Sequence, residues 1–401
     1  MKKIHLAIRS AARDHVQTVL QEALGSDFQA VAGGLFRSEI EGMLDHALQA
    51  ELATFLGRTT YERNGKGPWR NGSKTVALPS PLGSLSIEKP VLRKGGFNSS
   101  LLALLRGGMN QAIEVICQRS WLRGMSTRAV ASEMRELTGA KLSASDISEM
   151  TDKLLPSIDE WRKQPVPAVE ILYLDALYVP VRRGGETSKQ AVLVAIGVDA
   201  NRMRHFMGWL VGDSESTESW SALLDDLKGR GLGRVALAVS DAHKAIRAAV
   251  KNCLGVDHQL CVIHKMRAIL SQVQRADQKA FSEDFKAIFW ADGRHSARIG
   301  LANFRAAWEK RYPKLVAKAG DEFEDFTRFF DMPQAMWGLC RCSNTVERFI
   351  EEIRRRLDPA RIAVADKSLD KLIHAVATEQ QKRWDRQKLP STHLSRLRKA
   401  A

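Results

Sequence analysis

Three carboxylates stand at positions where a charge needs an explanation. Asp175 lies in the middle of the apolar stretch ILYLDALYVPV, and Asp241 directly follows the apolar stretch RVALAVS. Glu347 belongs to SNTVERFIEEIRRRL, whose spacing predicts an amphipathic helix capped at Ser343 or Asn344. Clustered carboxylates repel one another unless hard divalent cations such as Mg²⁺ bind their oxygens. Two such ions about 3.5–4 Å apart can activate a water or 3′-hydroxyl and stabilise the leaving oxygen in phosphodiester cleavage and strand transfer.

Each carboxylate also has an ordinary structural explanation. Asp241 could cap the helix predicted for DAHKAIRAAV, and Asp175 could face water at a sheet edge. Glu347, Glu351 and Arg355 are four residues apart and could form a solvated row on one helix face. Each explanation is reasonable alone. Together they require three independent coincidences, each at a position where a catalytic site of this fold needs an acid. We therefore take Asp175, Asp241 and Glu347 as candidate catalytic and metal-binding residues.

The elements that must position these acids follow a recognisable order. Three strand-like segments come first: ILYLDALYVPV, QAVLVAIGVDA and RHFMGWLVGD. A helix with Thr217 as its expected cap, the strand RVALAVS, a helix over about 242–252 and the strand HQLCVI follow. The order β-β-β-α-β-α-β predicts an α/β ribonuclease-H-like core, a mixed five-stranded sheet in which antiparallel strands are continued by parallel ones. Asp175 and Asp241 then lie on neighbouring strands.

The remainder of this half is helical in pattern. Residues from about 263 to 335 contain no strand candidate and predict an all-α insertion between Asp241 and Glu347. A basic helical tail ends the chain. QPVPAVE, at 164–170, is typical of a linker, so we predict a catalytic domain over 166–401 and a separate region over 1–165.

The predicted N-terminal region, mainly α-helical, contains a small β-hairpin. Polar, Gly-rich YERNGKGPWRNGSK leads into two alternating segments around Pro81, which predicts a hairpin over 61–94. Trp69 lies among four basic residues that are candidates for DNA contact: Arg63, Lys66, Arg70 and Lys74. An ordinary surface hairpin explains this segment about equally well.

Residues 110–153 predict a helix-turn-helix unit. WLRGMSTRAVASEMRELTG precedes KLSASDISEMTDKL, with Ser126 and either Ser143 or Ser145 as expected N-caps. Arg128 is a candidate for phosphate contact. A plain helical connector is the alternative, although we favour DNA binding.

The charge balance points to a polyanionic partner. The 401 residues include 61 Lys+Arg against 46 Asp+Glu, a formal net charge of +15. Such a balance favours nucleic acid. No apolar run approaches the roughly 20 residues of a spanning helix, which argues against a membrane partner. Five scattered cysteines form no disulfide framework, and the N-terminus lacks a secretion signal, so we expect a cytoplasmic protein.

Two further patterns invite a chemical interpretation. Cys261 and His264, with Cys340 and Cys342, could hold a structural zinc, but C-x-C is an uncommon ligand pair and we favour a site without zinc. Trp290 follows an acidic, apolar helix and could stack on a flipped DNA base. Most aromatics at helical spacing pack in a core instead.

The order of these motifs resembles that of transposases of the Mutator-like family of bacterial insertion sequences. The resemblance covers most of the chain and includes six motifs: ELATFLGRTTYERNG with RNGSKTV, RGMSTRAV with LSASDISEMTDKL, LYLDALYVPVR, AVSDAHKAI, CVIHKMR and SNTVERFIEEIRRR. Two departures from the family pattern are Ala268 and Ile350, where Asn is usual. Neither position is a carboxylate.

The resemblance implies a DDE transposase in which Asp175, Asp241 and Glu347 hold two Mg²⁺ or Mn²⁺ ions. The implied reaction is cleavage at terminal inverted repeats and strand transfer to target DNA, by a homodimer or larger assembly in the bacterial cytoplasm, at the nucleoid. The segment with Cys261, His264 and Arg267 then organises the start of the insertion without a required metal.

Basic residues of the Glu347 helix are further candidates for DNA contact: Arg348, Arg354 and Arg355. A catalytically decayed or domesticated DNA-binding protein is the alternative function. A ribonuclease-H-like nuclease of another purpose, such as a junction resolvase, is disfavoured by the helical insertion and the helix-turn-helix unit.

Overall fold

The computed structural model describes residues 28–59, 62, 68–183, 186–357 and 364–390. These residues form two compact units, one ending at Lys153 and the other beginning at Leu154. Arg63 and Lys66, two of the basic residues predicted to contact DNA, lie outside the described residues.

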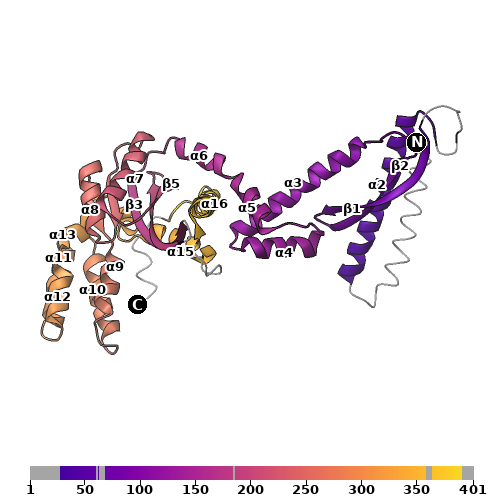
Figure 1. Cartoon of the computed structure of the whole chain (residues 1–401). Helices are drawn as coiled ribbons and strands as arrows, with labels where there is room; N and C mark the ends of the chain where they lie inside the picture. The colour runs from indigo at the N-terminus through magenta and orange to yellow at the C-terminus, as the bar shows by residue number, and fades with distance from the viewer. Residues whose placement is uncertain (1–27, 60–61, 63–67, 184–185, 358–363, 391–401) are drawn as a thin grey trace. The chain divides into compact units, whose positions relative to one another are not determined.

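The described part of the first unit contains a long helix packed on a hairpin (Figure 1). Its elements are α2 (Phe28–Leu56), β1 (Arg70–Ser80) and β2 (Gly83–Leu92). The predicted hairpin is confirmed. Glu41 and Asp45 of α2 accept hydrogen bonds from the backbone N–H groups of Ser86 and Glu88, at 2.6 and 2.7 Å. The helix therefore satisfies donors at the β2 edge that would otherwise need water.

Three helices complete this unit: α3 (Ser100–Leu122), α4 (Thr127–Thr138) and α5 (Ala144–Asp152). They share one apolar cluster, which includes Cys117, Val130 and Ile147. Ser126 caps α4 by accepting from the N–H of Ala129. Ser143, rather than Ser145, caps α5 in a capping box with Asp146.

The second unit is built on a mixed sheet in the order β5-β4-β3-β6-β7. The strands are β3 (Ile171–Arg183), β4 (Glu186–Val198), β5 (Arg204–Gly212), β6 (Leu237–Ser240) and β7 (His258–Leu260). The pairs β3–β4 and β4–β5 are antiparallel, and the pairs β3–β6 and β6–β7 are parallel. The predicted five-stranded mixed sheet is therefore confirmed. A two-residue strand, β8 (Val364–Ala365), also pairs with β3.

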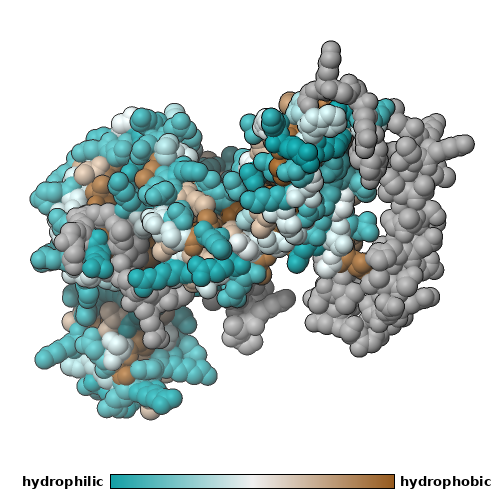
Figure 2. Space-filling model, turned by 45° about the vertical axis from the view of Figure 1, so that its right-hand side comes forward, coloured by the Kyte–Doolittle hydropathy of each residue, from teal (hydrophilic) through white to brown (hydrophobic). Residues whose placement is uncertain are grey.

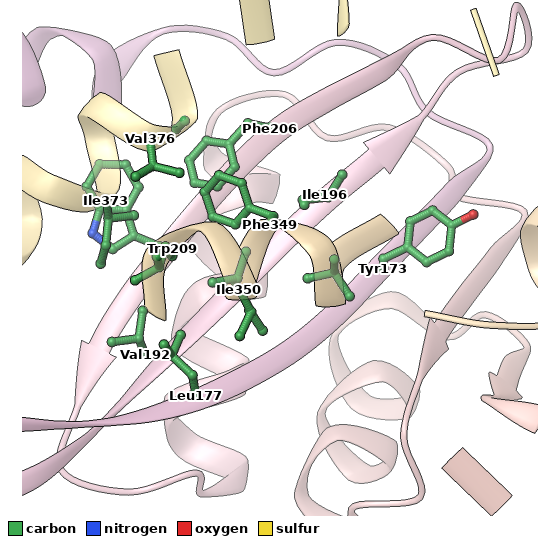
Figure 3. Close-up of a cluster of buried hydrophobic side chains, with 14 of the residues drawn as sticks. Tyr173, Leu177, Val192, Ile196, Phe206, Trp209, Phe349, Ile350, Ile373 and Val376 are labelled. Carbon is green, nitrogen blue, oxygen red and sulfur yellow. The ribbon is translucent and has the colours of Figure 1, made fainter. Parts of the chain in front are cut away.

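Helices cover both faces of this sheet. One face packs against α7 (Thr217–Gly229) and α8 (Lys244–Ala249), which continues into the π-helical turn η2 (Val250–Leu254). The opposite face packs against α15 (Asn344–Leu357) and α16 (Asp366–Trp384). Figure 3 shows this second core, in which Phe349 lies beside Phe206 and Ile350 lies near Leu177 and Val192. The cap of α7 is Ser216, not Thr217 as predicted, because the Ser216 hydroxyl accepts from the N–H of Ser219.

Helix α6 (Leu155–Lys163) also belongs to the second unit. Ile158 is buried in the core shared with α15 and α16, and the Trp161 ring lies 5.2 Å from that of Trp209. The linker predicted at 164–170 therefore follows a helix that already packs on the sheet.

An all-helical segment separates β7 from α15, as predicted. Its α-helices are α9 (Val262–Leu270), α10 (Gln278–Phe289), α11 (Arg294–Trp308), α12 (Pro313–Gly320), α13 (Phe323–Phe326) and α14 (Trp337–Cys340). Two 3₁₀ turns, η3 (Arg328–Asp331) and η4 (Gln334–Met336), precede α14. The segment has its own apolar core, which includes Phe281, Phe285 and Phe304. The buried side chain of Gln259 joins it to β7 through the carbonyl of Phe326 and the N–H of Phe329.

Within the described ranges, no helix combines the length and apolar character needed to cross a membrane. The face shown in Figure 2 carries mostly hydrophilic residues with scattered hydrophobic ones.

Candidate active site

The parallel pairing of β3 with β6 brings two of the predicted acids to the same level of the sheet. Ile171 pairs with Leu237, 66 positions further along the chain, and Tyr173 pairs with Val239. Asp241 is likewise 66 positions beyond Asp175. If the same register is extended one residue beyond the end of β6, Asp241 lies level with Asp175.

Strand alternation gives the face on which these acids lie. Tyr173 and Leu177 of β3, with Leu237 and Val239 of β6, are buried in the core beneath α15. Because side chains alternate along a strand, Asp175 lies on that same face, as does Asp241 if the alternation continues one residue past Ser240. Helix α15 contacts β3 on this side and carries Glu347 in its first turn.

Asp175 is an interior residue of the sheet rather than a wet edge residue. It pairs with Val194 of β4 on one side. On the other side of β3, β6 pairs with residues 171–173 and β8 pairs with Val181 and Arg182. Among the described residues, no strand pairs with Asp175 on that side. The pKa of Asp175 is raised to about 7, mainly by burial. The Ala176 N–H and His264 lower this pKa, and the nearby carboxylates Asp241 and Glu347 raise it.

Asp241 lies in the loop between β6 and α8 and is half-buried. Its Oδ1 accepts a hydrogen bond from the N–H of His243 at 3.0 Å. The N-cap residue of α8 is His243 and not Asp241, so the helix-capping explanation does not account for this acid. A fourth carboxylate, Glu215, lies 3.5 Å from His243 Nδ1 and was not identified from the sequence.

Glu347 is held by residues from two other segments. The Ser343 hydroxyl donates to its Oε1 at 2.8 Å, and Arg267 Nη1 donates to its Oε2 at 3.1 Å. His264 Nε2 lies 3.5 Å from Oε1. Burial would raise the pKa of Glu347, but the hydrogen bonds from Ser343 and Arg267 hold it below its ordinary value.

The solvated row predicted as an alternative for Glu347 is not present. Arg355 pairs with Glu352 at 2.6 Å, and Glu351 is exposed. Glu347 instead turns toward α9, where its partners His264 and Arg267 lie. The role of Ser343 as a partner of Glu347 was missed, although its position four residues earlier was a signal for such a contact.

The Cys-x-x-His segment fastens α9 to the start of α15. Cys261 Sγ accepts from the N–H of Ser343 at 3.4 Å, and the N–H of Val262 donates to the carbonyl of Arg341 at 2.9 Å. A hydrogen bond with Cys261 raises the pKa of His264 to about 9, against the effect of burial. The segment therefore positions two partners of Glu347.

Ligand atoms of Cys261, His264 and Glu347 all lie within 4.8 Å of one another. Within the described part of the chain, Asp175, Asp241, Cys340 and Cys342 belong to no such closely spaced group of three. Cys340 is buried in the apolar core, and burial raises the pKa of Cys342 to about 11. Two of the four ligands considered for zinc thus lie outside the closely spaced group.

The remaining predicted site residues have varied surroundings. Lys74, Arg128, Arg348, Arg354 and Arg355 are exposed, and Arg70 donates to Gln49 at 3.0 Å. Trp290 is half-buried against the core of the helical segment, and the guanidinium of Arg341 lies 5.2 Å from its ring centre. Base stacking by Trp290 stays a prediction.

Comparison with known proteins identifies the family. The profile described as "Transposase, Mutator family" matches residues 12–387. The transposase for insertion sequence element IS406 of Burkholderia multivorans is 31% identical over 85% of this chain and 89% of its own length. The transposase for IS256 in transposon Tn4001 of Staphylococcus aureus is 26% identical over 96% of this chain and 97% of its own length. For the transposase of IS905 from Lactococcus lactis, the identity is 29%, over 80% of this chain and 82% of its own length. The match to the profile runs through both units and the residues described above, and the chain therefore belongs to the Mutator family of transposases.

Proposed function

We propose that this transposase binds the terminal inverted repeats of its insertion sequence, cleaves the DNA there and transfers the strand to a target. Asp175, Asp241 and Glu347 are the catalytic carboxylates of a ribonuclease-H-like DDE domain. The observation that carries this proposal is that Asp241 directly follows β6, whose parallel register with β3 aligns it with Asp175, on the side of the sheet covered by the helix of Glu347.

The donor chemistry fits hard divalent cations. Asp175 has a raised pKa in part because Asp241 and Glu347 are near, and a cation relieves such repulsion. The three carboxylates would hold Mg²⁺ or Mn²⁺, whereas Cys261 and His264 suit a softer metal. When bound, the ions supply charge stabilisation at the phosphodiester oxygens and activation of the nucleophile.

The chain's own residues orient the third carboxylate. Ser343 fixes one oxygen of Glu347, and Arg267 approaches the other from α9. Arg267 is exposed beyond this contact and can also meet a phosphate of the substrate. Asp175 must be ionised to serve as a ligand, and its pKa of about 7 means that protons compete for it near neutral pH.

In this proposal, the first unit contributes to DNA binding. Arg128, at the start of α4, and Lys74, on β1, present exposed positive charge on two separate elements. Exposed cations of this kind bind phosphates with little dependence on sequence. Because both ends of an insertion sequence must be cut, we propose a homodimer or larger assembly on DNA.

Cleavage of a labelled duplex bearing the element's own end tests the proposal, in Mg²⁺ or Mn²⁺. Asp241→Asn should lose the cleaved products and still bind the duplex, and Asp225→Asn, at an exposed position on α7, is the matched control. Metal-dependent cleavage by Asp241→Asn would remove that residue from the triad.

A decayed, DNA-binding copy is the second candidate, because two family Asn positions are occupied by Ala268 and Ile350. Ile350 is only 3% exposed and packs in the core beneath α15. Wild-type binding without cleavage in the assay above would favour this candidate.

A further inference from the structure

A cavity of about 670 Å³ lies on the flank of α15. It is bounded by the first residues of α15, the end of α16 and the first residue of β5. The residues that matter for its chemistry are Arg204, Asn344, Thr345, Arg348, Arg383 and Trp384. Arg348 lines the cavity and directly follows Glu347 in α15, whose own side chain turns toward α9.

Arg204 has an incompletely used guanidinium in this cavity. The group lies over the ring of Trp384 at 5.2 Å, which holds it in place. Its Nε is buried and has no hydrogen-bond partner. A buried donor without a partner is costly, so the guanidinium of Arg204 is incompletely satisfied by the protein. A ligand in the cavity would meet its terminal N–H groups rather than the buried Nε.

The carboxylates around the cavity do not neutralise Arg204 and Arg348. Glu352 is engaged by Arg355 and Arg356, at 2.6 and 2.8 Å. Arg383 is already paired with Glu379 at 2.6 Å. Glu351 also lines the cavity but is exposed. Arg204 and Arg348 both line the cavity. Burial, and then the charge of Arg348, lower the pKa of Arg204, as expected for two like charges facing one space.

We propose that this cavity binds a backbone phosphate of the DNA strand that passes the catalytic carboxylates, with Arg204 and Arg348 as its two cationic ligands. Guanidinium groups suit phosphate because their N–H donors match its oxygens in pairs. Asn344 and Thr345 add polar groups at the N-terminal end of a 14-residue helix, where the backbone favours an anion. The inference rests on the proposed function in taking DNA as the substrate and in taking Asp175, Asp241 and Glu347 as the catalytic carboxylates.

The salt dependence of DNA binding tests the cavity without any cleavage. The full chain is titrated with a 30-base-pair duplex in EDTA at several salt concentrations. Each phosphate contact contributes about 0.9 to the slope of log K against log salt. Arg348→Gln and Arg204→Gln should each lower the magnitude of that slope by about 0.9. Arg275→Gln, an exposed arginine in the helical segment and away from the cavity, should leave it unchanged.

Two further variants sharpen the result. If both arginines hold one phosphate, the double variant should lose no more slope than either single variant, because interacting residues are not additive. Arg204→Lys keeps the charge and loses the planar fork, so it should retain the slope and weaken binding several-fold. Thermal melting checks that each variant is folded. If Arg204→Gln does not fold, Arg348→Gln still tests the proposal, because it changes only an exposed side chain.

The proposal is overturned if both single variants match Arg275→Gln. It is also overturned if inorganic phosphate raises the wild-type melting temperature through these arginines while the DNA slope is unaffected, because the cavity would then bind free phosphate. If the two single variants keep the wild-type salt slope and the wild type cleaves DNA normally, only the proposed phosphate site in the cavity is rejected. If the two single variants have a reduced salt slope and the wild type does not cleave DNA, only the proposed cleavage reaction is rejected.

Discussion

Glu347 and Lys74 are both charged side chains on regular elements, but their surroundings differ. Glu347 is half-buried and touches Ser343, His264 and Arg267, which come from two segments. Lys74 is exposed on a hairpin strand, as Arg128 is on α4. The second unit therefore orients its candidate catalytic charges, whereas the first unit presents Lys74 and Arg128 to solvent.

This difference predicts two kinds of response to mutation. An oriented group acts with its neighbours, so removing one member of the set should disable the reaction. Exposed cations contribute separately to a screened, long-range attraction, so each should contribute a small, salt-dependent share. The predictions below test this contrast in order of expected effect.

Asp175→Asn should lower the rate of DNA cleavage by at least about 10³-fold, because the isosteric amide cannot carry the ligand charge. Quantified cleavage of the end-bearing duplex measures this, with DNA binding followed in parallel. Asp225→Asn, an exposed acid on α7, is the matched control. A cleavage rate within tenfold of wild type would remove Asp175 from the catalytic set.

Ser343→Ala should lower cleavage by about 10–100-fold, the usual cost of losing a group that orients a metal ligand. The variant should also need more Mn²⁺ for half-maximal cleavage, a change that lost stability alone would not produce. Ser271→Ala, at the exposed end of α9, is the control. An unchanged Mn²⁺ requirement would mean that Ser343 does not position Glu347.

Asp175→Asn should also change the pH dependence of stability in the metal-free protein. The folded-state pKa of Asp175 is raised to about 7, so its carboxyl is neutral at pH 5 and charged at pH 8. The folded wild type therefore loses stability as the pH rises through this window. In EDTA, the melting temperature of the variant should exceed that of wild type by a few degrees at pH 8 and by less at pH 5, because the stability of wild type falls from about pH 4, the ordinary Asp pKa, up to about pH 7. The same difference at both pH values would contradict the raised pKa.

Lys74→Gln and Arg128→Gln should have the smallest effects. Each should lower the magnitude of the salt slope of DNA binding by about 0.9 and leave the cleavage rate of saturated complexes unchanged. Lys279→Gln, an exposed residue of α10, is the control. Loss of cleavage at saturation would show that the first unit takes part in the chemistry, and would remove the contrast between the units.

Local patterns were sufficient for the strands and for the helix of Glu347. The alternation in ILYLDALYVPV separates Leu172 and Leu174 from Tyr173 and Leu177, which lie on opposite faces as the pattern requires. The expectation that Asp175 and Asp241 lie on neighbouring strands followed from element order. Boundaries were less accurate, and the α7 cap is one residue earlier than predicted because Ser216 and Thr217 are chemically similar candidates.

Contacts between distant segments could not be read from the pattern. Arg267 meets Glu347 across 80 residues, and Gln259 meets the backbone of Phe329 across 70. Neither pairing has a local signature, because the fold alone brings these residues together. Arg204 is a similar case, since only its neighbours Trp384 and Arg348 distinguish it from other basic residues.

Replacement of Glu347 by Gln tests the central claim most directly. The assay is Mg²⁺- or Mn²⁺-dependent cleavage of the element's own end, with Glu351→Gln as an exposed control on the same helix. The proposed triad predicts that Glu347→Gln binds the end and does not cut it, while Glu351→Gln cuts normally. Normal cleavage by Glu347→Gln, or its loss in Glu351→Gln instead, would contradict the assignment of Glu347 as the third carboxylate.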